Sequence, residues 1–258
     1  MKTMIRKSML YKTGVEYGDY TMNHVLGCSH GCKYPCYAFL MAKRFGKVKD
    51  YTEWLEPYLV SNTLELLKKE IPKLNSKIES VQLCFTTDPF MLGYPDIQEM
   101  SLAAMKLLNS HGIKCTALTK GLLPRELVGL SKENEYGITF ISLDEEYREK
   151  TEPGASSYVE RLAALKYLHD NGCKTWVSIE PYPTPNLIKQ DLLPILEAVS
   201  FADRIIFGRT NYSKDITSYK DHKAFYNTQA KTVINFCKSR NISFYIKDGT
   251  LTEEKTNE

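Results

Sequence analysis

Three cysteines with short spacing are the residues of this chain best suited to chemistry. Cys28, Cys32 and Cys36 lie within the run 27–38. Three neighbouring thiols can bind three irons of a 4Fe–4S cube, which leaves the fourth iron without a protein ligand. An open iron can bind a substrate or a cofactor, whereas structural zinc sites and electron-transfer clusters usually carry four protein ligands. The spacing therefore predicts a catalytic iron–sulfur cluster.

Two other uses of these cysteines fit less well. The remaining cysteines at positions 84, 115, 173 and 237 are scattered, and no long apolar segment follows the basic first residues as a signal peptide would require. We therefore expect a reducing, cytoplasmic setting, in which disulfides are rare. A zinc site needs a fourth ligand, and with His30 the pattern becomes Cys-x-His-x-Cys-x3-Cys, which is not a common zinc spacing.

The composition is that of a globular protein with no membrane span. Hydrophobic residues make up 43% of the 258 residues and charged residues 25%. No apolar stretch approaches the ~20 residues of a membrane-spanning helix. The 34 basic and 31 acidic residues give a net charge of +3, which neither requires nor excludes a nucleic-acid partner. We expect one domain over residues 1–258, with an N-terminal arm at 1–20 and a flexible polar tail at 251–258.

Short apolar runs alternate with amphipathic stretches along the chain. Strands are predicted at 21–26, 81–85, 114–118, 138–143, 175–179 and 204–207, with a seventh at 242–246. Helix starts are predicted where a capping residue precedes an acidic residue by three positions: Asn62 with Glu65, Asp96 with Glu99, and Ser157 with Glu160. Pro124 suits the first turn of a short helix.

Strands that alternate with helices favour βα units and a parallel sheet. Six or seven such units predict an α/β fold, a partial or nearly closed parallel (βα) barrel. In such barrels the chemistry lies at the carboxyl ends of the strands. Polar residues follow every predicted strand there: Thr86, Thr87 and Asp88 after the second, Lys120 after the third, Ser142 at the fourth, Glu180 after the fifth, and Arg209 and Asn211 after the sixth.

These motifs together resemble one enzyme family. Gly-Cys-x-His-x-Cys-x-Tyr, Cys-Tyr-Ala, Thr-Asp-Pro at 87–89, Thr-Lys at 119–120, Ser-Leu-Asp at 142–144, Glu-Pro at 152–153 and Arg161 follow in order. This series is similar to the radical S-adenosylmethionine (SAM) enzymes, and to their spore photoproduct lyase-like branch, over about residues 23–211. One departure is clear. The family usually has two residues between the second and third cysteines, and this chain has three, so Pro35 resembles an insertion.

The resemblance implies a particular chemistry. Cys28, Cys32 and Cys36 would hold a 4Fe–4S cluster, and S-adenosylmethionine would bind its open iron. One electron, from an external reductant of the flavodoxin or ferredoxin type, would cleave this cofactor to a 5′-deoxyadenosyl radical that abstracts hydrogen from a substrate. The substrate stays open among a nucleic acid, a peptide and a small metabolite. The alternative function is a non-catalytic iron–sulfur electron carrier or sensor.

The resemblance also implies roles for residues around the cofactor. Tyr34 would lie against the adenine. Thr86, Thr87 and Asp88 would meet the amino group of the methionine part. Lys120 would pair with its carboxylate, Ser142 would bind the ribose or the carboxylate, and Glu180 would contact the ribose or the substrate.

Three further residues are given expected positions or roles. His30 is expected to orient the cysteine loop, and Arg161, one turn inside a helix, to be solvated or paired along that helix. Cys84 is either a donor that returns hydrogen to a product radical or a buried thiol. Strand alternation would place Cys84 on the same face as Asp88. The expected substrate walls are Glu180, Tyr182, Arg209, Asn211 and Tyr212, with the basic N-terminal arm.

Overall fold

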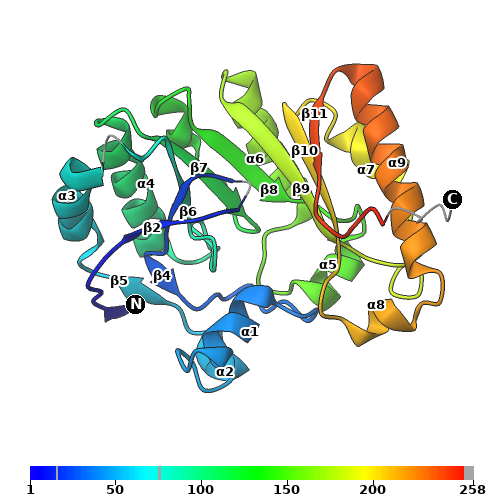
Figure 1. The fold of residues 1–258 in the computed structure, drawn as a ribbon, viewed down its shortest axis with the longest axis horizontal. Helices are drawn as coiled ribbons and strands as arrows, with labels where there is room; N and C mark the ends of the chain where they lie inside the picture. Colours follow the sequence, from blue (N-terminus) through cyan, green and yellow to red (C-terminus); the bar gives the residue numbers. More distant parts are fainter. Residues whose placement is uncertain (16, 75–76, 253–258) are drawn as a thin grey trace, which may run out of the picture.

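A long, mostly parallel sheet forms the centre of the protein (Figure 1). The computed structural model describes residues 1–15, 17–74 and 77–252. The strand order of this sheet is β11-β10-β9-β8-β7-β6-β3-β2. Every neighbouring pair is parallel except β2 with β3 at one edge. Because β11 and β2 lie at opposite edges and do not pair, the sheet is an open barrel, which confirms the predicted α/β fold class.

The large sheet contains seven parallel strands among the described residues. Its strands are β2 (Leu10–Lys12), β3 (Tyr20–Met22), β6 (Ser80–Leu83), β7 (Lys114–Thr119), β8 (Glu135–Thr139), β9 (Lys174–Tyr182), β10 (Arg204–Arg209) and β11 (Ser243–Ile246). A smaller sheet has the order β1-β5-β4, formed by β1 (Lys2–Met4), β4 (Val25–Leu26) and β5 (Tyr58–Val60).

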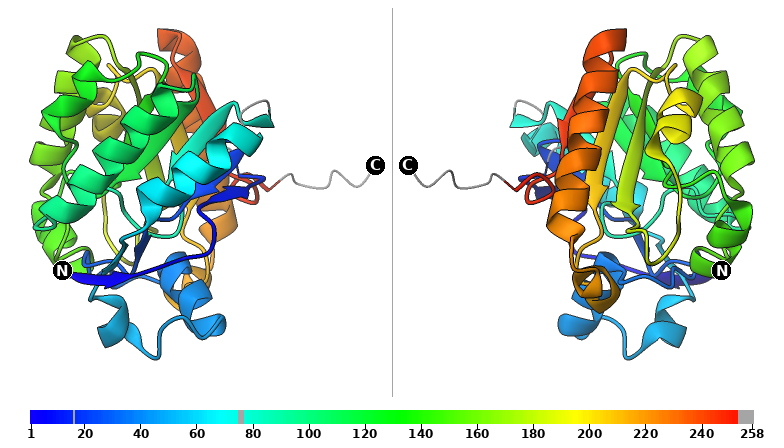
Figure 2. Two further views of the ribbon diagram at one scale, coloured as in Figure 1. Left: turned by 90° about the vertical axis from the view of Figure 1, so that its left-hand side faces the viewer. Right: turned by 90° about the vertical axis from the view of Figure 1, so that its right-hand side faces the viewer.

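Helices connect the parallel strands and cover the outer face of the sheet (Figure 2). The longer ones are α3 (Thr63–Leu74), α4 (Pro95–Asn109), α6 (Tyr158–Asp170) and α9 (His222–Arg240). The shorter ones are α1 (Tyr37–Arg44), α2 (Tyr51–Trp54), the 3-10 helix η2 (Arg125–Gly129), α5 (Glu145–Thr151), α7 (Leu192–Ala198) and α8 (Lys214–Ser218). Figure 1 shows α1, α5 and α8 gathered at the same end of the sheet.

The predicted helix starts lie at or next to the observed ones, but only one of them shows the expected capping bonds. Ser157 and Glu160 form the predicted capping box at the start of α6. The helix α3 begins directly after Asn62, and η2 directly after Pro124. The predicted cap at Asp96 is wrong, because α4 begins one residue earlier with Pro95 at its first position and Tyr94 before it. Proline favours this first position since its missing N–H is not needed there.

Three sequence-based boundaries differ from the structure. The strand predicted at 21–26 is divided between β3 and β4, which belong to different sheets. The strand predicted at 138–143 ends at Thr139, and the one predicted at 81–85 ends at Leu83. After β6 and β8 apolar residues continue past the last strand residue, so the sequence pattern does not show the end of the pairing, whereas β3 is followed by the polar residues Asn23 and His24.

The segment expected as an N-terminal arm carries two strands that pair with the rest of the fold. Within residues 1–20, β1 pairs with β5 and β2 pairs with β3. The Asn62 amide joins this segment to α3 through hydrogen bonds with the backbone of Arg6. Of the polar tail predicted at 251–258, residues 253–258 lie outside the described residues. No helix in the described ranges is long and apolar enough to cross a membrane.

Candidate active site

The cysteine loop is held by backbone contacts from two distant segments. The Cys28 amide donates to the Trp54 carbonyl at 2.8 Å, and the Tyr51 hydroxyl donates to the Cys32 carbonyl at 2.6 Å. On the other side, Gly154 packs so closely that a Cβ there would lie 2.2 Å from the Ser29 carbonyl oxygen. A side chain at this position would push the loop away, so glycine is required for the approach.

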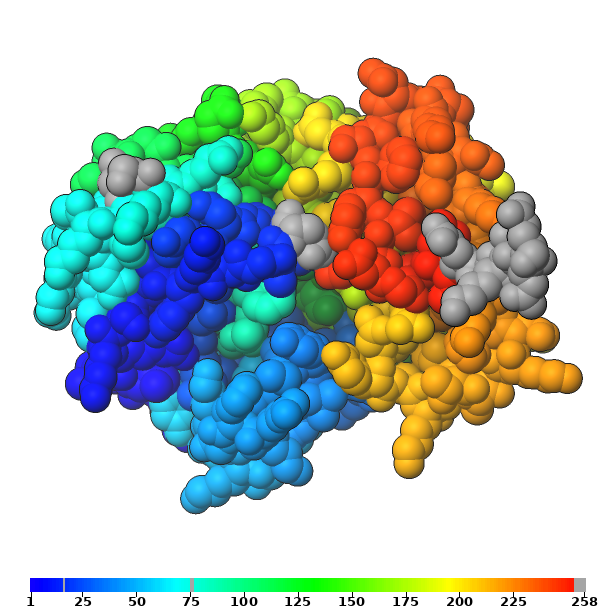
Figure 3. Space-filling view, viewed as in Figure 1, coloured from blue at the N-terminus to red at the C-terminus, as the bar shows by residue number. Residues whose placement is uncertain are grey.

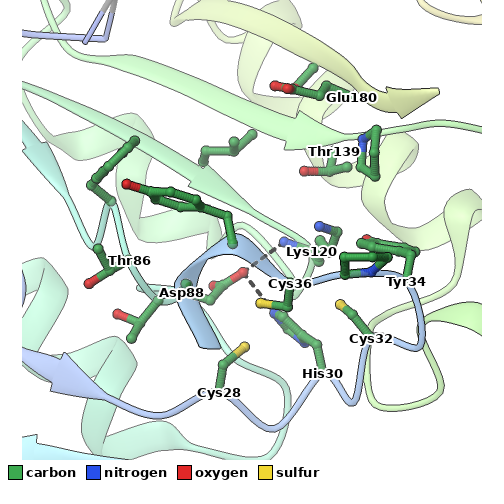
Figure 4. A pocket seen from close by; sticks show the side chains of 18 of the residues that line it. Cys28, His30, Cys32, Tyr34, Cys36, Thr86, Asp88, Lys120, Thr139 and Glu180 are labelled. Carbon is green, nitrogen blue, oxygen red and sulfur yellow. Dashed lines mark hydrogen bonds and ion pairs between the residues drawn. The ribbon is translucent and has the colours of Figure 1, made fainter. Parts of the chain in front are cut away.

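All three thiols open into one pocket of about 410 Å³. Figure 4 shows the sulfur atoms of Cys28, Cys32 and Cys36 facing a shared space, and Cys36 also precedes the first residue of α1. Within the described ranges no three His, Cys, Asp or Glu side chains are arranged to hold a single metal ion. A cluster has a different requirement, since each cysteine binds a different iron.

Asp88 joins the cysteine loop to the end of β7. Its Oδ2 lies 2.7 Å from His30 Nε2 and accepts from the Lys120 amide at 2.8 Å, while Oδ1 accepts from Thr119 Oγ1 and the Phe90 amide. Burial alone would raise the pKa of Asp88, but His30 and these hydrogen bonds lower it below its ordinary value. The imidazole of His30 also faces the Gly154 carbonyl at 3.3 Å, so the predicted loop-orienting position of His30 is confirmed.

The four hydrogen bonds fill the lone-pair positions of the Asp88 carboxylate. Asp88 lines the pocket but is only 4% exposed. The expected direct contact with an amino group of the cofactor therefore has no free acceptor.

Glu152 is a second buried carboxylate with several partners, and it lies behind the cysteine loop. Its carboxylate accepts from Tyr34 Oη at 2.5 Å and from Arg161 Nη2 at 2.7 Å, and Lys120 Nζ lies 3.8 Å away. Burial alone would raise the pKa of Glu152, but Lys120, Arg161 and the Tyr34 hydrogen bond lower it. The expectation that Arg161 is solvated is wrong. Arg161 is fully buried and also donates to the Thr139 carbonyl at 2.9 Å.

Lys120 and Tyr34 lie together on the pocket wall. The ammonium of Lys120 lies 5.4 Å from the centre of the Tyr34 ring, within the range of a cation–π contact. Both residues line the pocket, as does the extra residue Pro35. We call this side of the pocket the cysteine half, comprising Cys28, Cys32, Cys36, Tyr34, Asp88 and Lys120.

Two buried polar atoms of the pocket lack well-formed hydrogen bonds to the described residues: Thr87 Oγ1 and Gln82 Oε1. Unsatisfied buried atoms are rare in folded proteins, and a ligand is one of their explanations. Thr86 differs, because its hydroxyl and its amide both donate to Asn23 Oδ1. The Thr87 side chain does lie near the Cys84 thiol, whose pKa is raised by burial and lowered in part by Thr87, so Gln82 Oε1 is the clearer case of a polar pocket atom without a protein partner, which fits the binding of a polar cofactor.

The opposite side of the pocket is formed by the ends of β8, β9 and β10. Figure 4 shows Thr139 and Glu180 across the space from the cysteines. Glu180 lies 3.2 Å from Lys247 Nζ, and the Tyr212 ring stacks on Tyr37 with centroids 6.3 Å apart. We call this side the rim half, comprising Thr139, Ser178, Glu180, Arg209 and Tyr212. Figure 3 shows the surface hollowed between the N-terminal strands, α1 and the segment after β10.

Two predicted residues do not reach the pocket. Ser142 is buried, donates to Gln190 Oε1 at 2.6 Å and accepts from the Asp144 amide. It lies beyond the end of β8, so Thr139 is the residue of this strand that lines the pocket. Tyr182, expected as a substrate wall, is 1% exposed and packs against Phe207 in the core.

Cys84 lies at the edge of the pocket, but its thiol contacts His24. The distance from Cys84 Sγ to His24 Nδ1 is 3.4 Å. His24 Nε2 lies 2.8 Å from Ser101 Oγ, which donates to the Pro89 carbonyl, so Nε2 carries the imidazole proton and Nδ1 accepts from the thiol. Burial raises the pKa of Cys84 to about 12. The prediction that strand alternation places Cys84 on the same face as Asp88 is wrong, because β6 ends at Leu83 and Cys84 has a positive φ of 52°.

Several residues of the site were not assigned by the sequence. Glu152 was only part of a motif, and Asn23, Gln82, Thr139 and Ser178 had no role. Thr139 and Ser178 are register partners on β8 and β9 that both face the pocket. Strand alternation would have pointed to them if the end of β8 had been known. No local signal marks Glu152, since its burial depends on tertiary packing.

Comparison with known proteins identifies the family. The family profile described as the radical SAM superfamily matches residues 22–199, which is more than half of the chain. The chain belongs to the radical SAM superfamily. Membership implies a 4Fe–4S cluster, S-adenosylmethionine and a source of reducing electrons. It therefore supports an enzyme, with the substrate left open.

Relatives by sequence have no assigned activity. The uncharacterized protein ORF301 of Acidianus two-tailed virus is 27% identical over 195 residues, which cover 72% of this chain and 64% of that protein. The uncharacterized protein MJ0683 of Methanocaldococcus jannaschii is 28% identical over 187 residues, covering 70% of this chain and 67% of that protein. The match thus spans just under two thirds of the viral relative.

Solved structures show the same fold. A spore photoproduct lyase complexed with dinucleoside spore photoproduct has a TM-score of 0.66 and 16% identity, covering 94% of this chain and 80% of that one. SuiB of Streptococcus suis bound to S-adenosylmethionine has a TM-score of 0.57 and 15% identity, covering 88% of this chain and 46% of that one. At these identities the likeness concerns the fold alone.

Proposed function

We propose that this protein is a radical SAM enzyme in which the cysteine half binds the cluster and S-adenosylmethionine, and the rim half binds the substrate. The observation that carries the proposal is the shared pocket: three thiols of one loop open into the same cavity as the carboxyl ends of β6 to β10. The chemistry that the pair supplies when bound is one-electron cleavage of the sulfonium carbon–sulfur bond, which releases methionine and yields a 5′-deoxyadenosyl radical that takes hydrogen from substrate.

The residues of the cysteine half would bind and orient this cofactor. Cys28, Cys32 and Cys36 would each hold one iron. Lys120 would pair with the methionine carboxylate, because its ammonium lines the pocket and its ion pair with Glu152 is a long one of 3.8 Å. Thr87 would direct its hydroxyl toward the methionine end.

Other residues would shape the cavity around the cofactor. Tyr34 would pack beside the adenine, held by its hydrogen bond to Glu152. Asp88 and His30 would position the loop and the Lys120 backbone without touching the cofactor. Thr86 would remain tied to Asn23. Glu180 would face the ribose or the substrate from the rim half.

Cys84 stays outside the proposed catalytic set. Its thiol hydrogen is directed to His24 Nδ1 and its side chain packs in a small apolar cluster with Val25 and Leu59. A free cysteine in such a place behaves as a small hydrophobic residue. We therefore assign to Cys84 the buried-thiol alternative.

Two parts of the proposal concern partners. A flavodoxin- or ferredoxin-type protein would supply the electron. The neighbouring lyase structure holds a dinucleoside spore photoproduct, which makes a nucleic-acid substrate one candidate beside a peptide and a small metabolite.

The test is cofactor cleavage by the anaerobically reconstituted protein. We expect about four irons per chain and formation of 5′-deoxyadenosine when dithionite and S-adenosylmethionine are added. The Cys32→Ala variant should form none, whereas Cys173→Ala, which removes a thiol far from the pocket, should match the wild type. A wild-type protein that carries the cluster but forms no 5′-deoxyadenosine would instead favour the electron carrier or sensor.

A further inference from the structure

A second cavity of about 290 Å³ adjoins the rim half. It is lined by residues 209–214 with Ile216, Thr217 and His222, between the end of β10 and the helices α8 and α9. The segment from Arg209 to Tyr212 lines this cavity and the main pocket alike. A ligand could therefore extend from one cavity into the other along this segment.

The charge of the second cavity is unbalanced. Arg209, Lys214 and His222 line it, and no aspartate or glutamate does. Asp215 and Asp221 are adjacent in sequence but are not among the lining residues. Among the residues that the structure describes, none forms an ion pair with Arg209, Lys214 or His222. The acids that line the main pocket differ, because Asp88 lies against His30 and Glu180 against Lys247.

The polar atoms of the second cavity also keep bonding capacity. Arg209 donates from Nε to Asn211 Oδ1 at 3.0 Å, which leaves the Nη groups of its guanidinium. His222 Nδ1 donates to the Tyr219 carbonyl at 2.9 Å, which leaves Nε2 as the acceptor nitrogen of the neutral ring. Ser213 precedes α8, yet its side chain makes no capping bond to that helix.

We propose that this cavity binds a phosphate group of the substrate, while the reacting carbon lies in the main pocket. A guanidinium and an ammonium beside hydroxyl groups are the donors that bind phosphate best, through charge-assisted hydrogen bonds. Without a carboxylate in the lining, Arg209 and Lys214 have no negative charge of the protein beside them in this cavity. The position of the reacting carbon rests on the proposed function. The phosphate site itself is inferred from the residues of the second cavity alone.

The phosphate could come from two sources of the same chemistry. One is the phosphomonoester of a small substrate, and the other is the phosphodiester of a nucleic-acid strand. Tyr212 stands between the two cavities with 70% of its surface exposed, so a ring attached to the phosphate could stack on it.

The test measures binding to the cluster-loaded protein with two probes. The first is thymidine 5′-monophosphate, with thymidine as the control that lacks phosphate. The second is a short labelled oligothymidylate with hydroxyl ends. The variant is Lys214→Gln, whose side chain lines only the second cavity. The matched control is Lys223→Gln, an exposed lysine on α9 outside both cavities.

At least one probe should bind, more weakly as salt is added. Lys214→Gln should weaken that binding about tenfold, while Lys223→Gln stays within about twofold. The probe that shows this pattern identifies the source of the phosphate. Equal affinity of Lys214→Gln and wild type, or no binding of either probe, would overturn the proposal.

Cofactor cleavage, measured on the same protein, separates the two proposals. If phosphate binding depends on Lys214 but no 5′-deoxyadenosine forms, the phosphate site is supported and the radical function is rejected. Cleavage of S-adenosylmethionine without binding of either probe rejects only the phosphate site.

Discussion

The cysteine half and the rim half of the pocket differ in how their charges are paired. In and behind the cysteine half the buried charges are matched: Asp88 faces His30, and Glu152 is held by Arg161 and Tyr34. In the rim half Glu180 is paired with Lys247, but Arg209, and Lys214 in the cavity beside it, have no ion-pair partner among the described residues. Matched, buried charges hold a fixed geometry, whereas unmatched cations at a rim remain available to a ligand.

This difference agrees with a division of labour between cofactor and substrate. A reactive cofactor needs a rigid, preorganised site, and buried networks of charge supply that rigidity. A substrate must enter and leave, so its charged groups should meet partners that the protein has left free. The difference between the two halves should therefore appear both in stability and in binding.

The largest effect should come from Glu152→Ala. Removing this carboxylate leaves Arg161 buried and unpaired, which should cost about 3–5 kcal/mol of unfolding free energy. Arg209→Ala in the rim half should cost under about 1 kcal/mol. Urea unfolding of the two variants measures the contrast. Should Glu152→Ala not fold, Glu152→Gln keeps an acceptor for Arg161 and should still lose more than Arg209→Ala; similar losses would mean that the two halves are equally rigid.

A smaller effect, on affinity alone, is expected at Lys120. The Lys120→Gln variant should bind S-adenosylmethionine about tenfold more weakly, because one charge-assisted contact is lost, while the visible spectrum of the cluster stays unchanged. Lys114→Gln is the matched control, since Lys114 begins the same strand β7 and pairs with Glu79 at the opposite end. Unchanged affinity in Lys120→Gln would place this lysine in the structural network around Glu152 only.

The smallest effect concerns pH and His24, which lies behind the cysteine half. Burial, and then the charge of Arg6, lower the pKa of His24 to about 3. The unfolded chain therefore takes up a proton below about pH 6.5 that the folded chain does not, so stability falls as pH decreases through that value. Between pH 6.5 and 5.5 we expect a loss of about 1 kcal/mol.

Urea unfolding at these two pH values checks the sign. The His24→Gln variant, which cannot titrate, should lose correspondingly less over the same interval. An equal loss in both proteins would assign the pH dependence to groups other than His24.

The sequence named pocket residues on both sides, Glu180 and Arg209 in the rim half as well as those of the cysteine half, and the reason is local. The three cysteines, Tyr34 and Lys120 belong to short motifs at strand ends, so βα alternation was enough to bring them together. Ser142 and Cys84 were misplaced because each strand ended before its apolar run did. Arg161 was misjudged because nothing in the first turn of a helix reveals that tertiary packing will bury a guanidinium.

The cavity beside the rim half could not have been predicted from the sequence. Arg209 ends a strand, Lys214 begins α8 and His222 begins α9. Their juxtaposition depends on how the segment after β10 folds back, and residues 210–221 carry no motif that fixes this path. The fold class, in contrast, followed from the order of strands and helices alone.

The central claim is that three cysteines hold a cluster whose open iron takes S-adenosylmethionine. The most direct measurement is the electron paramagnetic resonance spectrum of the reduced, reconstituted protein with and without this cofactor. We predict the spectrum of a reduced 4Fe–4S cluster that changes when S-adenosylmethionine is added, and no cluster signal in Cys32→Ala. A cluster spectrum that the cofactor leaves unchanged would contradict the claim.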